Sequence, residues 1–196
     1  MTEPQRRREL SDIEALKALA HPLRQQMLAW LQRHGSATSA DLAVTFTADR
    51  GATSYHLRQL ARFGFIEEDG ARSAGRRRYW RAVPQDLRLP RRSANADIDA
   101  EVGTAAQEIA RLWRERAEGH LAGFLADPDA FGDFGTAAMH SFGGTTLTAG
   151  ELAEFAEEYI ALLNRWRREP DQAPPGSRHI TVLFNAFPTP DDGAPS

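Results

Sequence analysis

The chain has 196 residues, of which 41% are apolar, and it contains no cysteine. This length and apolar content suffice for one large or two small folded domains. Without cysteine the protein has no disulfide bonds, no thiolate metal ligands and no nucleophilic thiol. No stretch approaches the ~20 apolar residues that would cross a bilayer, and the arginine-rich first ten residues lack the apolar core of a secretory signal. We therefore expect a cytoplasmic protein that does not enter a membrane.

Charge is distributed unevenly along the chain, although the net charge is only −3. Residues 1–92 carry 17 arginines and lysines against 10 acidic residues, a net charge of +7. Residues 93–196 carry 7 against 17, a net charge of −10. A basic surface attracts a polyanion such as nucleic acid, whereas an acidic surface repels it. Any polyanion partner is therefore expected to bind the first half of the chain.

The first half begins with two predicted helices. Apolar residues at helical spacing predict a helix over residues 10–20, with Ser11 as its N-cap and Glu14 three residues later. Pro22 stops this helix and starts the second, because proline is tolerated in a first helical turn. Gly35 is expected to end the second helix.

A shorter helix, a turn, a fourth helix and a hairpin are predicted to follow. The third helix is expected over residues 36–46 and the fourth over residues 52–63, with a turn at 47–51 between them. Short strands are expected at residues 65–67 and 76–83, joined by a flexible loop. This order of elements is that of a winged helix-turn-helix.

The second half is predicted to contain two helices and two strands. Apolar residues that step by four and three predict a long helix over residues 95–125, with a narrow seam suited to a partner helix. Thr148 and Glu151 form a capping pair at the start of the second of these helices. Strands are expected at residues 137–142 and 179–187, and the latter is short and apolar enough to be buried.

The strongest local signal is the stretch 52–60, with the sequence ATSYHLRQL, followed by FGFI at 63–66. A recognition helix needs small residues at its start, hydrogen-bond donors on its outer face, leucines inside and a glycine that releases the chain into the wing. All four features occur here. Together with LKALAHPLR at 16–24, this segment resembles the ArsR-like winged helix-turn-helix regulators of bacteria, and the likeness covers residues 11–83.

The resemblance implies a homodimer that reads a palindromic operator in double-stranded DNA, with the fourth helix in the major groove and the wing along the backbone or minor groove. By position, it implies that Tyr55, Arg58 and Gln59 meet base edges or nearby phosphates, while arginines of the wing hold phosphate. Structural alternatives stay open: Thr53 as a packed or capping residue, His56 as a scaffold histidine, and an arginine of the charged loop as a merely solvated side chain. The predicted DNA-binding residues are Thr53, Ser54, Tyr55, His56, Arg58, Gln59, Arg76, Arg77 and Arg78.

Metal sensing, which many members of that family perform, is not expected here. Metal-sensing members place cysteines in the third helix, where this chain has Thr38-Ser39-Ala40-Asp41, with Thr38 and Asp41 as a capping pair. On the long helix, Asp97 and Asp99 are followed by no histidine until His120. The six histidines show no i, i+4 pairing of the kind that binds zinc. We therefore expect neither a metal nor a cofactor.

Aromatic residues of the second half offer a site for an apolar small-molecule effector, since ligand pockets are mostly apolar with a few polar anchors. The alternative is that these residues form a core, because a region of this size needs most of its aromatics for stability. The predicted pocket residues are Trp113, Phe124, Phe134, His140, Tyr159 and Trp166.

The expected fold class is mainly α with a small β component, a winged helix-turn-helix followed by a C-terminal α+β dimerisation or effector region. The expected parts are a flexible basic N-terminal tail (1–10), a winged helix-turn-helix DNA-binding domain (11–92), a long linker and dimerisation helix (93–127), a C-terminal α+β domain (128–188) and a disordered tail (189–196).

The predicted function is that of a transcription regulator, a repressor that binds a palindromic operator as a homodimer and is released by an effector or a change in dimer geometry. Activation stays open, because the sequence does not show where the operator lies. The alternative is a protein-interaction module that keeps the winged-helix scaffold without sequence-specific DNA binding. No enzyme is expected, because the sequence has no glycine-rich phosphate loop, nucleophile elbow or suitably spaced carboxylate pair.

Overall fold

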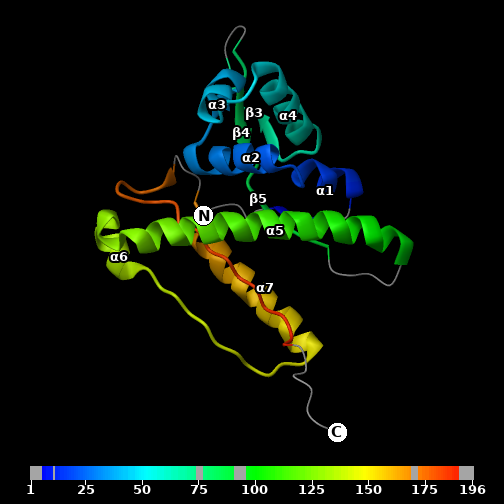
Figure 1. Cartoon of the computed structure of the whole chain (residues 1–196), viewed down its shortest axis with the longest axis vertical. Coiled ribbons are helices and arrows are strands. Elements are labelled where there is room, and N and C mark those ends of the chain that lie inside the picture. Colours follow the sequence, from blue (N-terminus) through cyan, green and yellow to red (C-terminus); the bar gives the residue numbers. More distant parts are fainter. Residues whose placement is uncertain (1–5, 11, 74–76, 91–95, 169–171, 190–196) are drawn as a thin grey trace. The chain divides into compact units, whose positions relative to one another are not determined.

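Figure 1 shows a computed structural model of the chain, which describes residues 6–10, 12–73, 77–90, 96–168 and 172–189. The chain forms two compact units. The first unit comprises residues 1–116 and 168–179, and the second comprises residues 117–167 and 180–196. Among the described residues, no helix is both long and apolar enough to cross a membrane.

The first unit contains the helices α1 (Ile13–Leu19), α2 (Pro22–His34), α3 (Ser39–Thr45) and α4 (Arg50–Arg62). The N-cap of α1 is Asp12 and not the predicted Ser11, because the Asp12 carboxylate accepts the amide hydrogen of Glu14. The capping pair predicted for α3 is confirmed: Thr38 and Asp41 cap each other reciprocally.

A small antiparallel sheet completes the winged-helix order of elements. Its three strands are β2 (Ala37–Thr38), β4 (Tyr79–Ala82) and β3 (Ile66–Glu68), in the order β2-β4-β3. Gly64 lies between α4 and β3 with a φ of 67°, a left-handed conformation that glycine adopts without steric cost. The hairpin of β3 and β4 forms the wing, in which Glu67 lies opposite Arg81 and Glu68 opposite Trp80.

The start of the chain corrects the expectation of a flexible tail at residues 1–10. Arg6–Glu9 form β1, which pairs in parallel with β5 (Gln85–Arg88), a strand that the sequence did not predict. Leu10 is 1% exposed, because it packs into the core, and the Arg8 guanidinium lies 4.6 Å above the ring of Phe65. Residues 1–5 lie outside the described part of the chain.

One hydrophobic core holds the first unit together. The long helix α5 (Ala96–Ala126), which matches the prediction closely, contributes Ala105 and Ile109 to it. The other large core side chains come from the N-terminal segment, the four helices and β3: Leu10, Leu16, Leu19, Met27, Leu28, Leu31, Leu42, Leu57, Leu60, Phe65 and Ile66.

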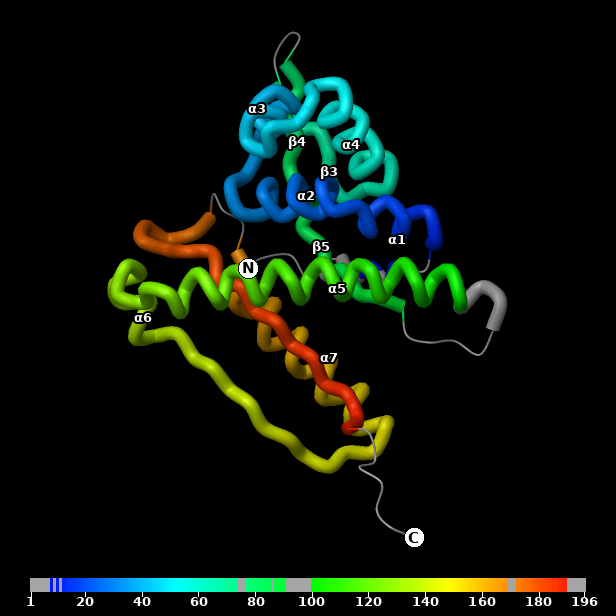
Figure 2. Tube along the Cα trace, viewed as in Figure 1, coloured from blue at the N-terminus to red at the C-terminus, as the bar shows by residue number. Residues whose placement is uncertain are grey.

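In the second unit, α5 is followed by a 3₁₀ helix (Pro128–Phe131), α6 (Asp133–Ala137) and α7 (Ala149–Trp166). The predicted capping pair of α7, Thr148 and Glu151, is confirmed. The expected strands at 137–142 and 179–187 are wrong, because neither segment pairs with another strand in the described chain. Figure 2 shows residues 180–189 running beside α7 as an extended segment. The described part of residues 128–188 is therefore helix and coil, and not α+β.

Candidate nucleic-acid interface

α4 begins at a well-formed cap and presents a buried face to the core. The Asp49 carboxylate accepts the amide hydrogen of Ala52, and Leu57 and Leu60 are fully buried. Thr53 is 0% exposed, and its hydroxyl donates to the backbone oxygen of Asp49 over 2.9 Å. The assignment of Thr53 to the DNA-binding residues is therefore corrected. Its buried side chain stabilises the first turn of α4, which agrees with the alternative of a packed or capping residue.

His56 also faces inward, toward α2. Its ring lies 4.4 Å from that of His21, centroid to centroid, and its Nδ1 is buried without a hydrogen-bond partner. The Nδ1 of His21 accepts the amide hydrogen of Leu23 and so caps α2. Burial lowers the pKa of both histidines. These contacts favour the scaffold interpretation of His56.

The outer face of α4 carries the remaining predicted contacts. Tyr55 is 49% exposed, Arg58 is exposed, and Ser54 and Gln59 are partly exposed. Arg58 forms no ion pair with a carboxylate of the described chain. This face therefore offers hydroxyl, amide and guanidinium groups to a ligand, which are the groups that read base edges and phosphates in the major groove.

A groove of about 430 Å³ lies where α3, α4 and the wing meet. It brings Ser54 and Arg58 of α4 together with Arg77 and Arg78 of the wing, which the sequence had placed in one site only by resemblance. The groove is lined by Thr38, Ser39, Ala40, Asp41, Ser54, Arg58, Arg77, Arg78, Tyr79 and Trp80.

The N-terminus of α3 is the part of this groove that sequence reasoning missed. The sequence predicted Thr38 and Asp41 as capping residues, which they are. Nothing in the capping pattern indicated that they also line a groove. The hydrogen bonds from Thr38 lower the pKa of Asp41, and the charge of Arg77 adds to this effect. Ser39, the first residue of α3, lines the groove, so the helix start faces it.

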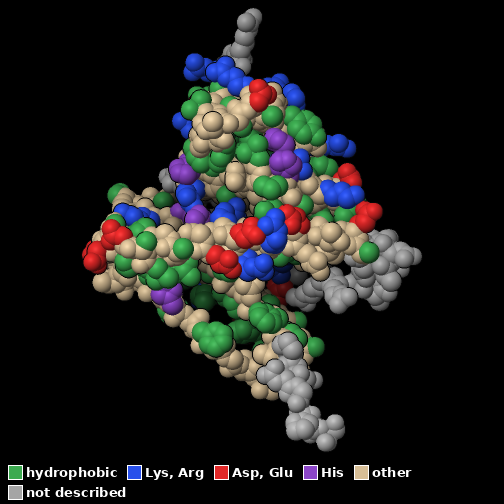
Figure 3. Space-filling view, in the orientation of Figure 1, with side chains coloured by type: hydrophobic (Ala, Val, Ile, Leu, Met, Phe, Trp, Pro, Cys, Tyr) green, Lys and Arg blue, Asp and Glu red, His purple; other side chains and the backbone are tan. Residues whose placement is uncertain are grey.

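The wing supplies positive charge beside this groove. Arg78 is 3.7 Å from Glu68 but remains largely exposed, and Arg77 forms no ion pair with a described carboxylate. Arg81 is paired with Glu67 at 2.6 Å, across the hairpin. Arg76 lies outside the described residues. Figure 3 shows lysine and arginine side chains gathered at the end of the first unit that carries the wing, α3 and α4.

The stretch LKALAHPLR at residues 16–24, which also carries the family resemblance, contains an arginine with a structural role, Arg24. Arg24 donates through its Nη2 to the backbone oxygen of Lys17 over 2.9 Å and through its Nε to that of Ala18. These carbonyls belong to the last turn of α1, where a cation is favourable. Arg24 therefore joins α1 to α2 and is not part of the groove.

The six residues predicted to line an effector pocket belong to two different units. Trp113 belongs to the first unit and donates from its indole nitrogen to Oε1 of Gln25 over 3.1 Å. In the second unit, Tyr159 stacks on Phe184, and Trp166 is 67% exposed. The rings of Phe124 and His140 are 6.0 Å apart, and Phe134 of α6 is partly buried. These contacts join only some of the residues, so the effector pocket stays a prediction.

Among the described residues, no three histidine, aspartate or glutamate side chains gather as a metal site would require. The side chains of Asp97 and Asp99 lie outside that part of the chain.

No protein-family model matches the chain, and no curated protein matches it with significance. A solved structure titled "Reduced HlyU from Vibrio cholerae N16961" aligns with 50% of this chain and 86% of that chain, at 18% sequence identity and a TM-score of 0.32. A likeness this low decides nothing about function. The winged-helix assignment rests on the order of the helices and on the three-stranded sheet.

Proposed function

We propose that the protein is a DNA-binding transcription regulator, a repressor that binds a palindromic operator as a homodimer in the cytoplasm and has no catalytic activity. One observation carries the proposal: Arg58 of α4 and Arg77 of the wing line the same groove, and neither is paired with a described carboxylate. Exposed arginines on two elements of a winged helix, at one groove, are suited to a base edge and to the phosphates beside it.

The roles within the groove follow from chemistry. Tyr55, Arg58 and Gln59 lie on the outer face of α4 and would meet base edges, and a bidentate arginine contact to guanine discriminates by about 1–3 kcal/mol. Arg77 and Arg78 would bind phosphate, which sets the position of the protein but carries no sequence information. Ser54 and Ser39 would add neutral hydrogen bonds to the backbone of the duplex.

Regulation would reach α4 through the helices beneath it. Trp113 of α5 binds Gln25 of α2, and Arg116 donates to the backbone oxygen of Gln25 over 3.4 Å. Lys17 of α1 is 3.0 Å from Glu101 of α5. A shift of α5, whether caused by an effector or by a change in the dimer, would therefore move α1 and α2. The two recognition helices of a homodimer must match half-sites about 34 Å apart, so such a shift would alter operator affinity.

The proposal is tested by selecting genomic fragments with the purified protein and titrating the best site with salt. A palindromic site whose affinity falls steeply with salt would support it, because several phosphates must be neutralised. The double variant Tyr55→Ala/Arg58→Ala should abolish specific binding and leave the oligomeric state unchanged. The matched control is Arg114→Ala, which removes an exposed arginine of α5 outside the groove. Absent or salt-indifferent binding by the folded protein would contradict the proposal and favour the protein-interaction module.

A further inference from the structure

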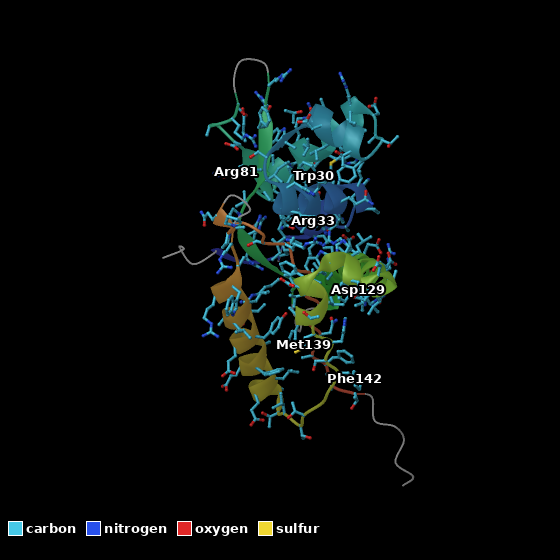
Figure 4. The ribbon with its side chains drawn as sticks, turned by 90° about the vertical axis from the view of Figure 1, so that its left-hand side faces the viewer. Trp30, Arg33, Arg81, Asp129, Met139 and Phe142 are labelled. Atoms are coloured by element: carbon cyan, nitrogen blue, oxygen red, sulfur yellow. The ribbon has the colours of Figure 1, made fainter. Side chains whose placement is uncertain are left out.

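The second unit has no buried residue in its described part, although its sequence is rich in large apolar side chains. Met139 and Phe142, labelled in Figure 4, lie exposed on the coil between α6 and α7. On α7, Phe155, Leu162 and Trp166 are all more than one third exposed. Burial of apolar surface is the main favourable contribution to folding, so this unit needs a partner surface that its described residues do not supply.

The apolar residues of α7 follow the spacing of a helix that pairs with another helix. Intervals of three and four residues alternate without a break along this seam, the pattern of the a and d positions in a coiled coil. Phe184 of the same chain stacks on Tyr159 at 3.8 Å and lies 5.8 Å from Phe155, so the extended segment covers part of the seam at its centre, while Phe155 keeps 42% of its surface exposed. The seam consists of Leu152, Phe155, Tyr159, Leu162 and Trp166.

The charges beside the seam indicate what covers it. Glu151, Glu158 and Arg165 recur every seven residues on one flank, while the other flank carries Ala156 and Leu163. Two parallel copies would place the charged flank of one helix against the uncharged flank of the other. Two antiparallel copies would instead bring like flanks together. Glu151 of each copy would then face Arg165 of the other, with Glu158 near its own counterpart.

We propose that α7 pairs with α7 of a second copy in antiparallel orientation through this seam. The pairing is self-complementary, because each Glu151–Arg165 contact occurs twice about a two-fold axis, as a closed dimer requires. The axis passes near residue 157, midway along the helix. The inference rests on the homodimer of the proposed function and assigns a surface to it.

Site-directed cross-linking tests this arrangement in the full-length protein without DNA. Because the chain has no cysteine, a single introduced thiol is unique. The two copies of residue 156 would be neighbours at the axis, whereas those of residue 149 would be roughly 24 Å apart along the helices. With a short bismaleimide, Ala156→Cys should give covalent dimers in high yield and Ala149→Cys should give almost none.

The outcomes distinguish failure of the α7 pairing from failure of the proposed homodimer. A protein that is dimeric by light scattering but does not cross-link through residue 156, or cross-links equally through residue 149, would overturn the α7 pairing and leave the homodimer standing. A monomer that captures no second copy would overturn both.

Charge substitutions give a second, independent measurement. Arg165→Glu would turn two attractive contacts into two repulsive ones and should raise the dimer dissociation constant about tenfold. Glu158→Gln would remove one repulsion and should lower it about twofold. Both side chains are exposed, so neither change threatens folding, and circular dichroism should be unchanged. Equal dissociation constants for the wild type and both variants would contradict the pairing.

Discussion

The imidazole rings of His21 and His56 lie 4.4 Å apart, one at the N-cap of α2 and the other on α4. Burial is the main cause that lowers the pKa of each, the charge of Arg24 lowers both further, and His21 also lowers that of His56. The Nδ1 of His21 must stay unprotonated to accept the Leu23 amide hydrogen. The contact between α2 and α4 is thus suited to two neutral rings.

We therefore expect the protein to lose stability as the pH falls below about 6.5, the ordinary pKa of histidine in an unfolded chain. Because the folded pKa values are lower, the unfolded state binds more protons in this range, and the free energy of unfolding decreases toward acid pH. Urea unfolding at pH 7.5 and 5.5 measures the effect. The double variant His21→Asn/His56→Gln should show a smaller difference between the two pH values. His140→Ala, at an exposed site, should keep the wild-type difference.

Arg58 and Arg77 should differ in what their removal does to DNA binding. Arg58→Ala should weaken binding to the operator by about 1–3 kcal/mol and relax the preference at one base pair. Arg77→Ala should weaken binding to all sequences alike and reduce the slope of log affinity against log salt by about one. Fluorescence anisotropy with operator and scrambled duplexes measures both. If Arg77→Ala changed the preferred base, the division between base and phosphate contacts would be wrong.

Substitutions at the neighbouring residues Thr53 and Ser54 should have different effects, the first on the free energy of unfolding and the second on DNA affinity. Thr53→Val removes the buried hydroxyl that bonds to Asp49, at a cost of about 1 kcal/mol of unfolding free energy. Ser54→Ala, in the groove, should leave stability within experimental error and weaken DNA binding. Thermal unfolding and anisotropy on the same two proteins give the comparison. A full loss of binding by a folded Thr53→Val protein would restore this residue to the DNA-contacting set.

Trp113 should matter for the stability of the first unit. Trp113→Phe would leave Gln25 without its side-chain donor, and Gln25 is 5% exposed with an Nε2 that already lacks a partner. Loss of the remaining contact should cost about 1–3 kcal/mol of unfolding free energy. Replacing Gln25 by Met in the same protein should recover part of this loss, since no buried polar side chain then remains unpaired. If no stability were recovered, packing of the indole ring, and not its hydrogen bond, would account for the contribution of Trp113 to the free energy of unfolding.

The parts of the fold that the sequence predicted depend on interactions between residues close together in the chain. Helix caps such as Thr38 with Asp41, and Thr148 with Glu151, involve residues three apart, so their geometry is contained in a short stretch of sequence. The helical spacing of buried leucines likewise fixed which face of α4 points inward.

The parts that could not be predicted depend on contacts between distant segments. β1 looks like a charged tail until β5, which lies beyond the wing, provides its hydrogen bonds. An apolar run such as 179–187 is compatible with a strand, yet a strand also needs a neighbour, which the described chain does not offer. The effector pocket stays a prediction for the same reason: a set of aromatic residues does not reveal which of them meet.

The parallel pairing of β1 with β5 has a mechanical consequence. Between these strands the chain runs through all four helices and the wing, and α5 begins shortly after β5. A pull on the segment before Arg6 and on α5 would draw the two strands past each other in opposite directions along their length. Their hydrogen bonds would then share the load, instead of opening one after another from an end. The pair is therefore loaded in shear. Tension transmitted through α5 would have to break these hydrogen bonds together before β1 could separate from β5.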